Sequence, residues 1–224
     1  MRKILLSLIT VSVFVTSIPA SGANKELRLD GKRLVSQKPA FTLALPSSLR
    51  LMHSSTSRFP EQSSLTRSYV CMSERNKQVE ELLIFQVAER TDPQAEPITV
   101  PPLRPSADER MYSKGRIEKE RRDVDFMVQL MAWNPLAPSL QPIRKAGFTI
   151  PSHLALQGQI LFVYDIDHAV LVWYSRDVHS FGLNVSEREA SWKKGSMGRT
   201  ENNVLDQFQE TMTEMMNSIR IPSF

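Results

Sequence analysis

The chain has 224 residues, with 28 lysines and arginines against 24 aspartates and glutamates, and a single cysteine, Cys71. A net charge of +4 indicates nucleic-acid binding only where the bases gather on one face, and the densest basic stretch, residues 116–125, interleaves its bases with acids. That mixture is typical of a solvated hairpin tip or strand edge, so we expect no nucleic-acid partner. One cysteine excludes an intramolecular disulfide, so burial must hold the fold together.

The first residues have the pattern of a secretory signal peptide. A basic pair at residues 2–3 precedes an uncharged, mostly apolar run at 4–18, which is shorter than the ~20 residues a helix needs to cross a bilayer. Small residues at 21–23 predict cleavage before Asn24. The signal at residues 1–23 holds two bases and no acids, so the mature chain carries 26 bases against 24 acids, a net of +2.

The mature chain, residues 24–224, has a length that suits one domain with a substantial core. We expect a periplasmic or extracellular protein with no stable membrane insertion after cleavage. The alternative is a signal that is retained as a membrane anchor.

Apolar alternation predicts several strands in the first half of the chain. Residues 40–48 predict a first strand, and residues 124–133 a later one. Residues 64–72 and 79–89 flank the polar stretch 73–78, a pattern that predicts an antiparallel hairpin with a long loop.

Proline dominates the middle of the chain, where nine of the 14 prolines fall between Pro93 and Pro151. Because proline lacks a backbone N–H, these segments cannot form a continuous strand ladder. We expect two stiff surface excursions, around residues 93–105 and 134–151. Deleting residues 97–105 is expected to spare folding.

Residues 160–177 contain two apolar runs joined by Asp165-Ile166-Asp167-His168. Apolar side chains point to both sides of each run, which predicts two strands in the middle of a sheet that is covered on both faces. A bound metal needs at least three converging ligands, and the side chains of Asp167 and His168 diverge. Aspartate is favoured in turns, so we interpret the cluster as a bend, with a metal or acid–base site as the alternative.

The C-terminal residues 200–221 have apolar side chains at three- and four-residue steps, which predicts an amphipathic helix with Thr200 as its N-cap. Its opposite face is acidic, which argues against docking on an anionic membrane. Ser186 and Glu189 form a capping-box pattern that predicts a short helix ending at Gly195.

No catalytic, cofactor-binding or metal-binding residue is assigned from the sequence, and no cofactor is expected. Cys71 lies inside an apolar strand, where a thiol behaves as a small hydrophobe. The histidines outside the bend occur singly, at His53, His153 and His179. The tryptophans are expected to pack in the core, with a pocket for an apolar or sugar ligand as the alternative; they are Trp133, Trp173 and Trp192.

An early strand "FTLALP", successive antiparallel strands, a proline-rich insertion and a closing helix "FQETMTEMMNSIRI" resemble the PsbP-like α/β/α sandwich over residues 40–221. The resemblance implies an accessory or assembly role, usually without catalysis. It carries no functional residue over by motif. Because the sequence predicts a single long helix, the second face of the sheet must be covered by short helices, the proline-rich segment or a partner.

The expected fold is α+β: an antiparallel sheet with the C-terminal amphipathic helix on one face, with a three-layer α/β/α sandwich left open. The expected function is that of a non-enzymatic exported accessory protein that binds a protein partner through the excursions between Pro93 and Pro151. The alternative is a small-ligand binder or hydrolase with a pocket between these loops and the sheet, using Trp133 or Trp173 with a histidine. Convergence of His153 or His179 with Asp177 and an exposed hydroxyl in a cleft would favour that alternative.

Overall fold

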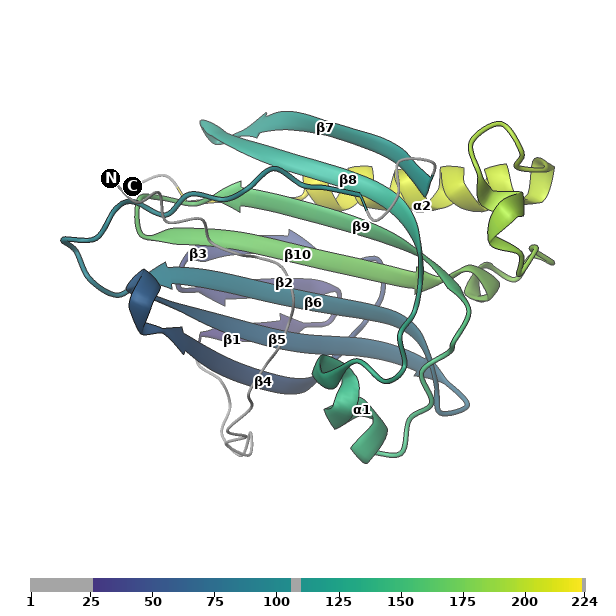
Figure 1. Cartoon of the computed structure of the whole chain (residues 1–224), viewed down its shortest axis with the longest axis horizontal. Helices are drawn as coiled ribbons and strands as arrows, with labels where there is room; N and C mark the ends of the chain where they lie inside the picture. The colour runs from purple at the N-terminus through teal and green to yellow at the C-terminus, as the bar shows by residue number, and fades with distance from the viewer. Residues whose placement is uncertain (1–25, 106–109, 223–224) are drawn as a thin grey trace.

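A computed structural model of the chain describes residues 26–105 and 110–222 (Figure 1). A small sheet contains β1 (Leu27–Asp30), β2 (Arg33–Gln37) and β3 (Ala40–Ala44). A large sheet contains β4 (Arg50–Phe59), β5 (Ser64–Arg75), β6 (Gln78–Arg90), β7 (Met111–Lys119), β8 (Arg122–Ala132), β9 (Leu154–Val163) and β10 (His168–Asp177). The helices are α1 (Gln141–Lys145) and α2 (Arg199–Asn217), and the 3-10 turns are η1 (Pro60–Gln62), η3 (Pro138–Leu140), η4 (Val178–Phe181) and η5 (Glu189–Trp192).

The large sheet is antiparallel throughout, in the order β4-β5-β6-β10-β9-β8-β7, and the small sheet has the order β1-β2-β3. The predicted α+β class is confirmed. The hairpin β9–β10 occupies the centre of the large sheet, as its apolar runs predicted. The signal peptide predicted at residues 1–23 lies outside the described residues.

The main core lies between the large sheet and a second layer made of α2 and the small sheet, which stand behind the large sheet in Figure 1. We call this side of the large sheet the core face. Phe41 of β3 packs on Phe85 and Phe162, with ring centroids 5.5 and 5.8 Å apart. Tyr174 of β10 stacks on Phe208 of α2 at 5.7 Å and 6°. The predicted apolar stripe of the helix is therefore the stripe that the sheet buries.

The helix begins differently from the prediction. Gly198, and not Thr200, is the N-cap residue of α2, and it makes no side-chain capping bond. The predicted capping box at Ser186 and Glu189 is wrong as well, because Ser186 Oγ accepts from the backbone N–H of Arg188 and only the 3-10 turn η5 follows. Local patterns at these positions were outweighed by tertiary contacts: the carboxylate of Glu201 accepts from Ser186 N at 3.0 Å.

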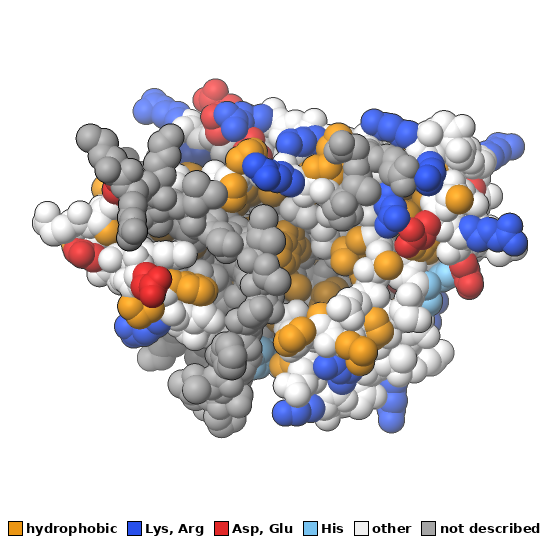
Figure 2. All heavy atoms as spheres, viewed as in Figure 1, with side chains coloured by type: hydrophobic (Ala, Val, Ile, Leu, Met, Phe, Trp, Pro, Cys, Tyr) orange, Lys and Arg blue, Asp and Glu red, His pale blue; other side chains and the backbone are white. Residues whose placement is uncertain are grey.

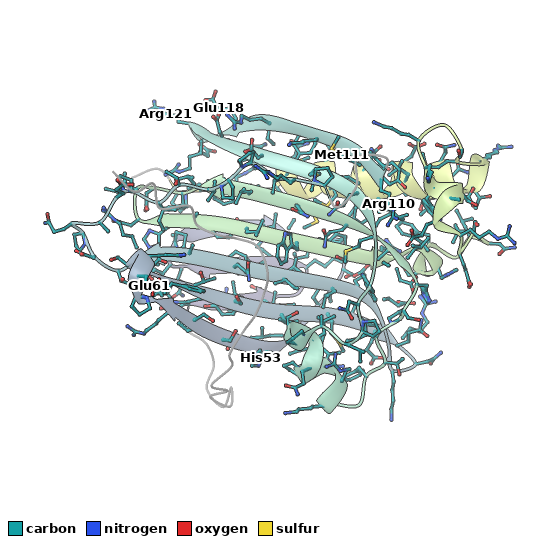
Figure 3. All side chains as sticks on the ribbon, in the orientation of Figure 1. His53, Glu61, Arg110, Met111, Glu118 and Arg121 are labelled. Atoms are coloured by element: carbon teal, nitrogen blue, oxygen red, sulfur yellow. The ribbon has the colours of Figure 1, made fainter. Side chains whose placement is uncertain are left out.

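Two tight turns shape the outer hairpins. Asn76 and Lys77, with φ of 51° and 63°, join β5 to β6, so the long loop predicted there is wrong: the strands continue to a two-residue turn. Glu120 and Arg121, with φ of 47° and 62°, join β7 to β8. The charged stretch around them is the hairpin tip that its mixed charge predicted, and Figure 3 labels Glu118 and Arg121 there.

On the opposite side of the large sheet, toward the viewer in Figure 1, the described segments that pack on the sheet lie at its two ends, and we call this side the open face. Residues 93–105, which we call the strap, cross one end. Ile98 N donates to Ile166 O at 3.0 Å, and Lys114 Nζ donates to Leu103 O at 2.6 Å. Ile98 and Leu103 are buried, so the strap is a packed layer and not a free excursion. Within residues 26–105 and 110–222, no helix is long and apolar enough to span a membrane.

Candidate functional site

The two proline-rich excursions lie over the same face of the large sheet, at opposite ends. Leu103 of the strap packs on Met127, Leu161 and Leu171. The second excursion folds into η3 and α1, whose buried residues cluster with Val70, Met72, Val79, Leu82 and Ala155. Figure 2 views this face directly and shows it hollowed near its middle, with hydrophobic side chains at the bottom of the hollow. Among residues 26–105 and 110–222, a short helix and the proline-rich segment cover part of the second face of the sheet, in line with the need that the sequence indicated.

Uncharged polar side chains cross the open face between the strap and α1. We call this set the polar belt; it comprises Ser68, Gln86, Gln129, Gln157, Gln159 and Ser175. Strand pairing brings them together, because Ser68 is opposite Gln86, and Gln157 is opposite both Gln129 and Ser175. Their positions alternate with core-face residues along each strand, as the pleat requires.

Hydrogen bonds between side chains link the polar belt into two groups. Gln129 Nε2 and Gln159 Nε2 both donate to Gln157 Oε1, each at 2.8 Å. Gln157 Nε2 donates to Ser175 Oγ at 3.5 Å, and Gln86 Nε2 donates to Ser68 Oγ at 3.0 Å. These bonds fix the orientation of the amides on a rigid sheet, which is how a pre-formed site presents donors and acceptors.

Trp173 lies at the strap side of the polar belt. On β10 it is opposite Gln159 of β9 and Ile84 of β6, and its ring packs on the cluster under the strap. Its Nε1–H is buried and has no hydrogen-bond partner within the described ranges. A buried donor without an acceptor costs about 1–3 kcal/mol, so a ligand that offers an acceptor there would gain that free energy.

A histidine cluster occupies the α1 end of the open face. His153 immediately precedes β9, Asp177 ends β10, and His179 lies in η4. His153 Nε2 is 3.0 Å from both carboxylate oxygens of Asp177, and one ligand atom from each of the three residues lies within 4.8 Å of the others. The structure thus brings together the residues that the sequence showed as scattered. The hydroxyl of the adjacent Ser180 donates through Oγ to the backbone carbonyl of Asp177.

The bend at residues 165–168 is a turn held by its own side chains. Asp165 Oδ1 accepts from Asp167 N at 2.8 Å and lies 2.8 Å from His168 Nδ1. Asp167 is paired with Arg90 at 2.6 Å. The interpretation of this cluster as the bend between two strands is confirmed.

The remaining candidates lie in packed surroundings. Cys71 is fully buried in the core, and burial raises the pKa of its thiol to about 12, which makes it a poor nucleophile. Trp192 is buried too, and its Nε1 donates to Ser186 O at 2.8 Å. Trp133 is buried in the cluster around α1. His53 lies on the edge strand β4, where burial lowers its pKa, and Figure 3 labels it near α1.

Comparison with known proteins adds no assignment: no family model matches the chain, and neither does a curated protein or a solved structure. The side chains on the open face are therefore the features of this protein that bear on its function. The sequence did not predict the polar belt, because its glutamines are spread over three strands: Gln86 on β6, Gln129 on β8, and Gln157 with Gln159 on β9.

Proposed function

We propose that this chain is an exported, non-enzymatic binding protein that holds a neutral, hydroxyl-rich ligand, such as a glycan, on the polar belt. The observation that carries the proposal is a row of uncharged amides and hydroxyls between two walls built by the proline-rich segments, beside the buried indole N–H of Trp173, which has no partner among the described residues. The pattern of residues 1–23 supports export to the periplasm or the cell exterior. The resemblance to the PsbP-like layout supports an accessory role, and it stays a prediction.

The chemistry of the polar belt favours a neutral ligand over a charged one. A buried ligand charge needs an opposite charge or a metal beside it, and the side chains of the belt carry none. Amides offer both donors and acceptors, which matches hydroxyl groups that also do both. The indole of Trp173 adds an apolar surface with a polar edge, which suits the mixed surface of a sugar ring.

The proposal can be tested by screening the mature protein on a glycan array and titrating captured oligosaccharides by calorimetry. Trp173→Phe keeps an aromatic ring and removes the N–H, and Gln159→Leu removes one amide of the belt. Each loses an interaction worth about 1–1.5 kcal/mol, so we expect an affinity drop of roughly tenfold. Gln207→Leu, an exposed glutamine on α2, is the matched control and should bind as the wild type does. Capture of no glycan, or equal affinity in all three variants, would contradict the proposal.

A protein partner at the second excursion is a second candidate, because Leu136 has 77% of its surface exposed at the tip of that excursion. An exposed leucine between two prolines is a stiff apolar contact point. A photo-crosslinking residue introduced in place of Leu136 should give a discrete adduct in cells. The same residue at Leu51, which is 37% exposed on β4, is the control. Adducts at both positions or at neither would count against this candidate.

A further inference from the structure

The histidine cluster, His153, Asp177 and His179, has no role in the ligand contacts that we propose for the polar belt. Asp177 is opposite Ala155 in the β9–β10 ladder, so its carboxylate reaches His153, which lies just before β9. His179 lies two residues after Asp177, in the 3-10 turn η4 that directly follows β10. The imidazole rings of His153 and His179 are 4.6 Å apart at 86°. Three potential ligands from two neighbouring segments thus face one point.

The distances suit a small metal ion. In a tetrahedral zinc site with bonds of about 2.0–2.1 Å, neighbouring ligand atoms are roughly 3.3 Å apart. His153 Nε2 and the Asp177 oxygens are already 3.0 Å apart, and the three ligand atoms fall within 4.8 Å of one another.

The cluster is also held in place by bonds around it. Asp177 is 3% exposed; its Oδ1 accepts from His179 N at 3.0 Å, and its backbone carbonyl accepts from Ser180 Oγ at 2.7 Å. Such outer bonds orient a carboxylate ligand. His179 Nε2 is buried and has no hydrogen-bond partner among residues 26–105 and 110–222. Glu187 Oε1 lies 3.8 Å from His179 Nε2, on a largely exposed side chain.

We propose that His153, Asp177 and His179 bind a divalent transition-metal ion of the zinc class. Two imidazoles and one carboxylate form a borderline donor set that suits zinc and its late first-row neighbours, whereas calcium and magnesium prefer oxygen ligands alone. Three protein ligands leave a fourth position for water or for Glu187. The bound ion satisfies His179 Nε2 and neutralises the buried carboxylate. It also adds one Lewis-acidic position at the end of the polar belt.

The test is calorimetric titration of the chelator-stripped mature protein with Zn²⁺, with no glycan present. We expect one equivalent to bind and the melting temperature to rise with Zn²⁺. His153→Ala and His179→Ala each remove a ligand. The Zn²⁺ affinity of each variant should fall at least roughly 10–100-fold, which is the loss typical of mutating a residue that only supports a metal ligand. An excess of Ca²⁺ or Mg²⁺ should not compete.

His179→Ala is the decisive variant, because it leaves the His153–Asp177 contact and the backbone cap of η4 in place. Its melting temperature in chelator should therefore match that of the wild type, and only the Zn²⁺-dependent rise should disappear. His168→Ala is the matched control, since it removes the imidazole of the other histidine–aspartate pair, at the bend, and should keep full affinity. Absence of stoichiometric Zn²⁺ in the wild type, wild-type affinity in His179→Ala, or an equal loss in His168→Ala would each overturn the proposal. Because no glycan is used, this result is independent of the ligand proposed for the polar belt.

Discussion

Gly158 of β9 lies directly against the side chain of Met212 of α2, so closely that a Cβ atom at position 158 would overlap the methionine sulfur. Gly158 is on the core face, between Leu156 and Ile160, and Met212 is buried. The helix can approach the centre of the sheet because this one position has no side chain.

Gly158→Ala should therefore destabilise the protein by about 1–3 kcal/mol, the usual cost of overpacking a core. The check is urea denaturation followed by circular dichroism. Met212→Ala alone leaves a cavity and should cost about 2–5 kcal/mol. In the double variant the new methyl occupies part of that cavity, so its loss should be smaller than the sum of the single losses. Strict additivity would show that the two side chains do not meet.

The strap is part of the folded core, and this changes what its deletion should do. Removing residues 97–105 would expose the apolar side chains at the strap end of the open face, so we now expect the deletion to destabilise the protein, contrary to the expectation from sequence. Leu103→Ala should cost about 2–3 kcal/mol, because Leu103 is buried on Met127 and Leu161. Leu136→Ala, in the exposed second excursion, is the control and should stay within about 0.5 kcal/mol. Equal effects in thermal unfolding would contradict a packed strap.

The parts of the fold that the sequence predicts well are those buried by a regular apolar pattern. The β9–β10 hairpin is apolar on both faces near its bend, and α2 has a stripe of helical period. The strands β4 and β7 were not predicted. Both are edge strands, and their residues are mostly half-buried or exposed, so no alternation of apolar and polar side chains marks them. Edge strands are defined by their neighbours more than by their own composition.

The candidate sites depend on strand register, which single segments do not reveal. Counting back from the bend at residues 165–168 places Asp177 opposite Ala155, and hence beside His153. That signal was present in the sequence once the hairpin was accepted. The contribution of His179 was not, because it requires the 3-10 turn after β10. The glutamines of the polar belt come together only when β8 is known to neighbour β9.

Glu89 should make stability depend on acid pH. Burial raises the pKa of Glu89, but the hydrogen bond and charge of Lys38, with the charges of Arg67 and His168, outweigh it and leave the pKa below the ordinary 4.5. As the pH falls, Glu89 is therefore protonated in the unfolded chain before it is protonated in the folded protein. The stabilisation that the ionised Glu89 gives to the fold is present above about pH 4.5 and is lost as the pH falls through the lowered pKa of the folded state. Glu89→Gln should have lower stability at pH 7 and a flatter loss of stability between about pH 5 and 3.

The measurement for Glu89 is the free energy of unfolding in urea across that pH range. Glu61→Gln, at an exposed position on η1 that Figure 3 labels, is the control and should follow the wild-type curve. If Glu89→Gln showed the same acid dependence as the wild type, the ion pairs of Glu89 with Lys38 and Arg67 would contribute nothing to folding.

Cys71 should be unreactive until the protein unfolds. Its side chain is fully buried on β5, and with a pKa of about 12 only about one thiol in ten thousand is the reactive thiolate at pH 8. A chromogenic disulfide reagent should therefore label the native protein at the rate of global or local opening, and should label the protein in guanidinium within the mixing time. Leu103→Ala, which weakens the opposite face, should speed native labelling by the factor that its loss of stability predicts, provided opening is global. Rapid stoichiometric labelling in native buffer would mean that the core around Cys71 opens without unfolding, and that the layer formed by α2 and the small sheet is not a permanent cover.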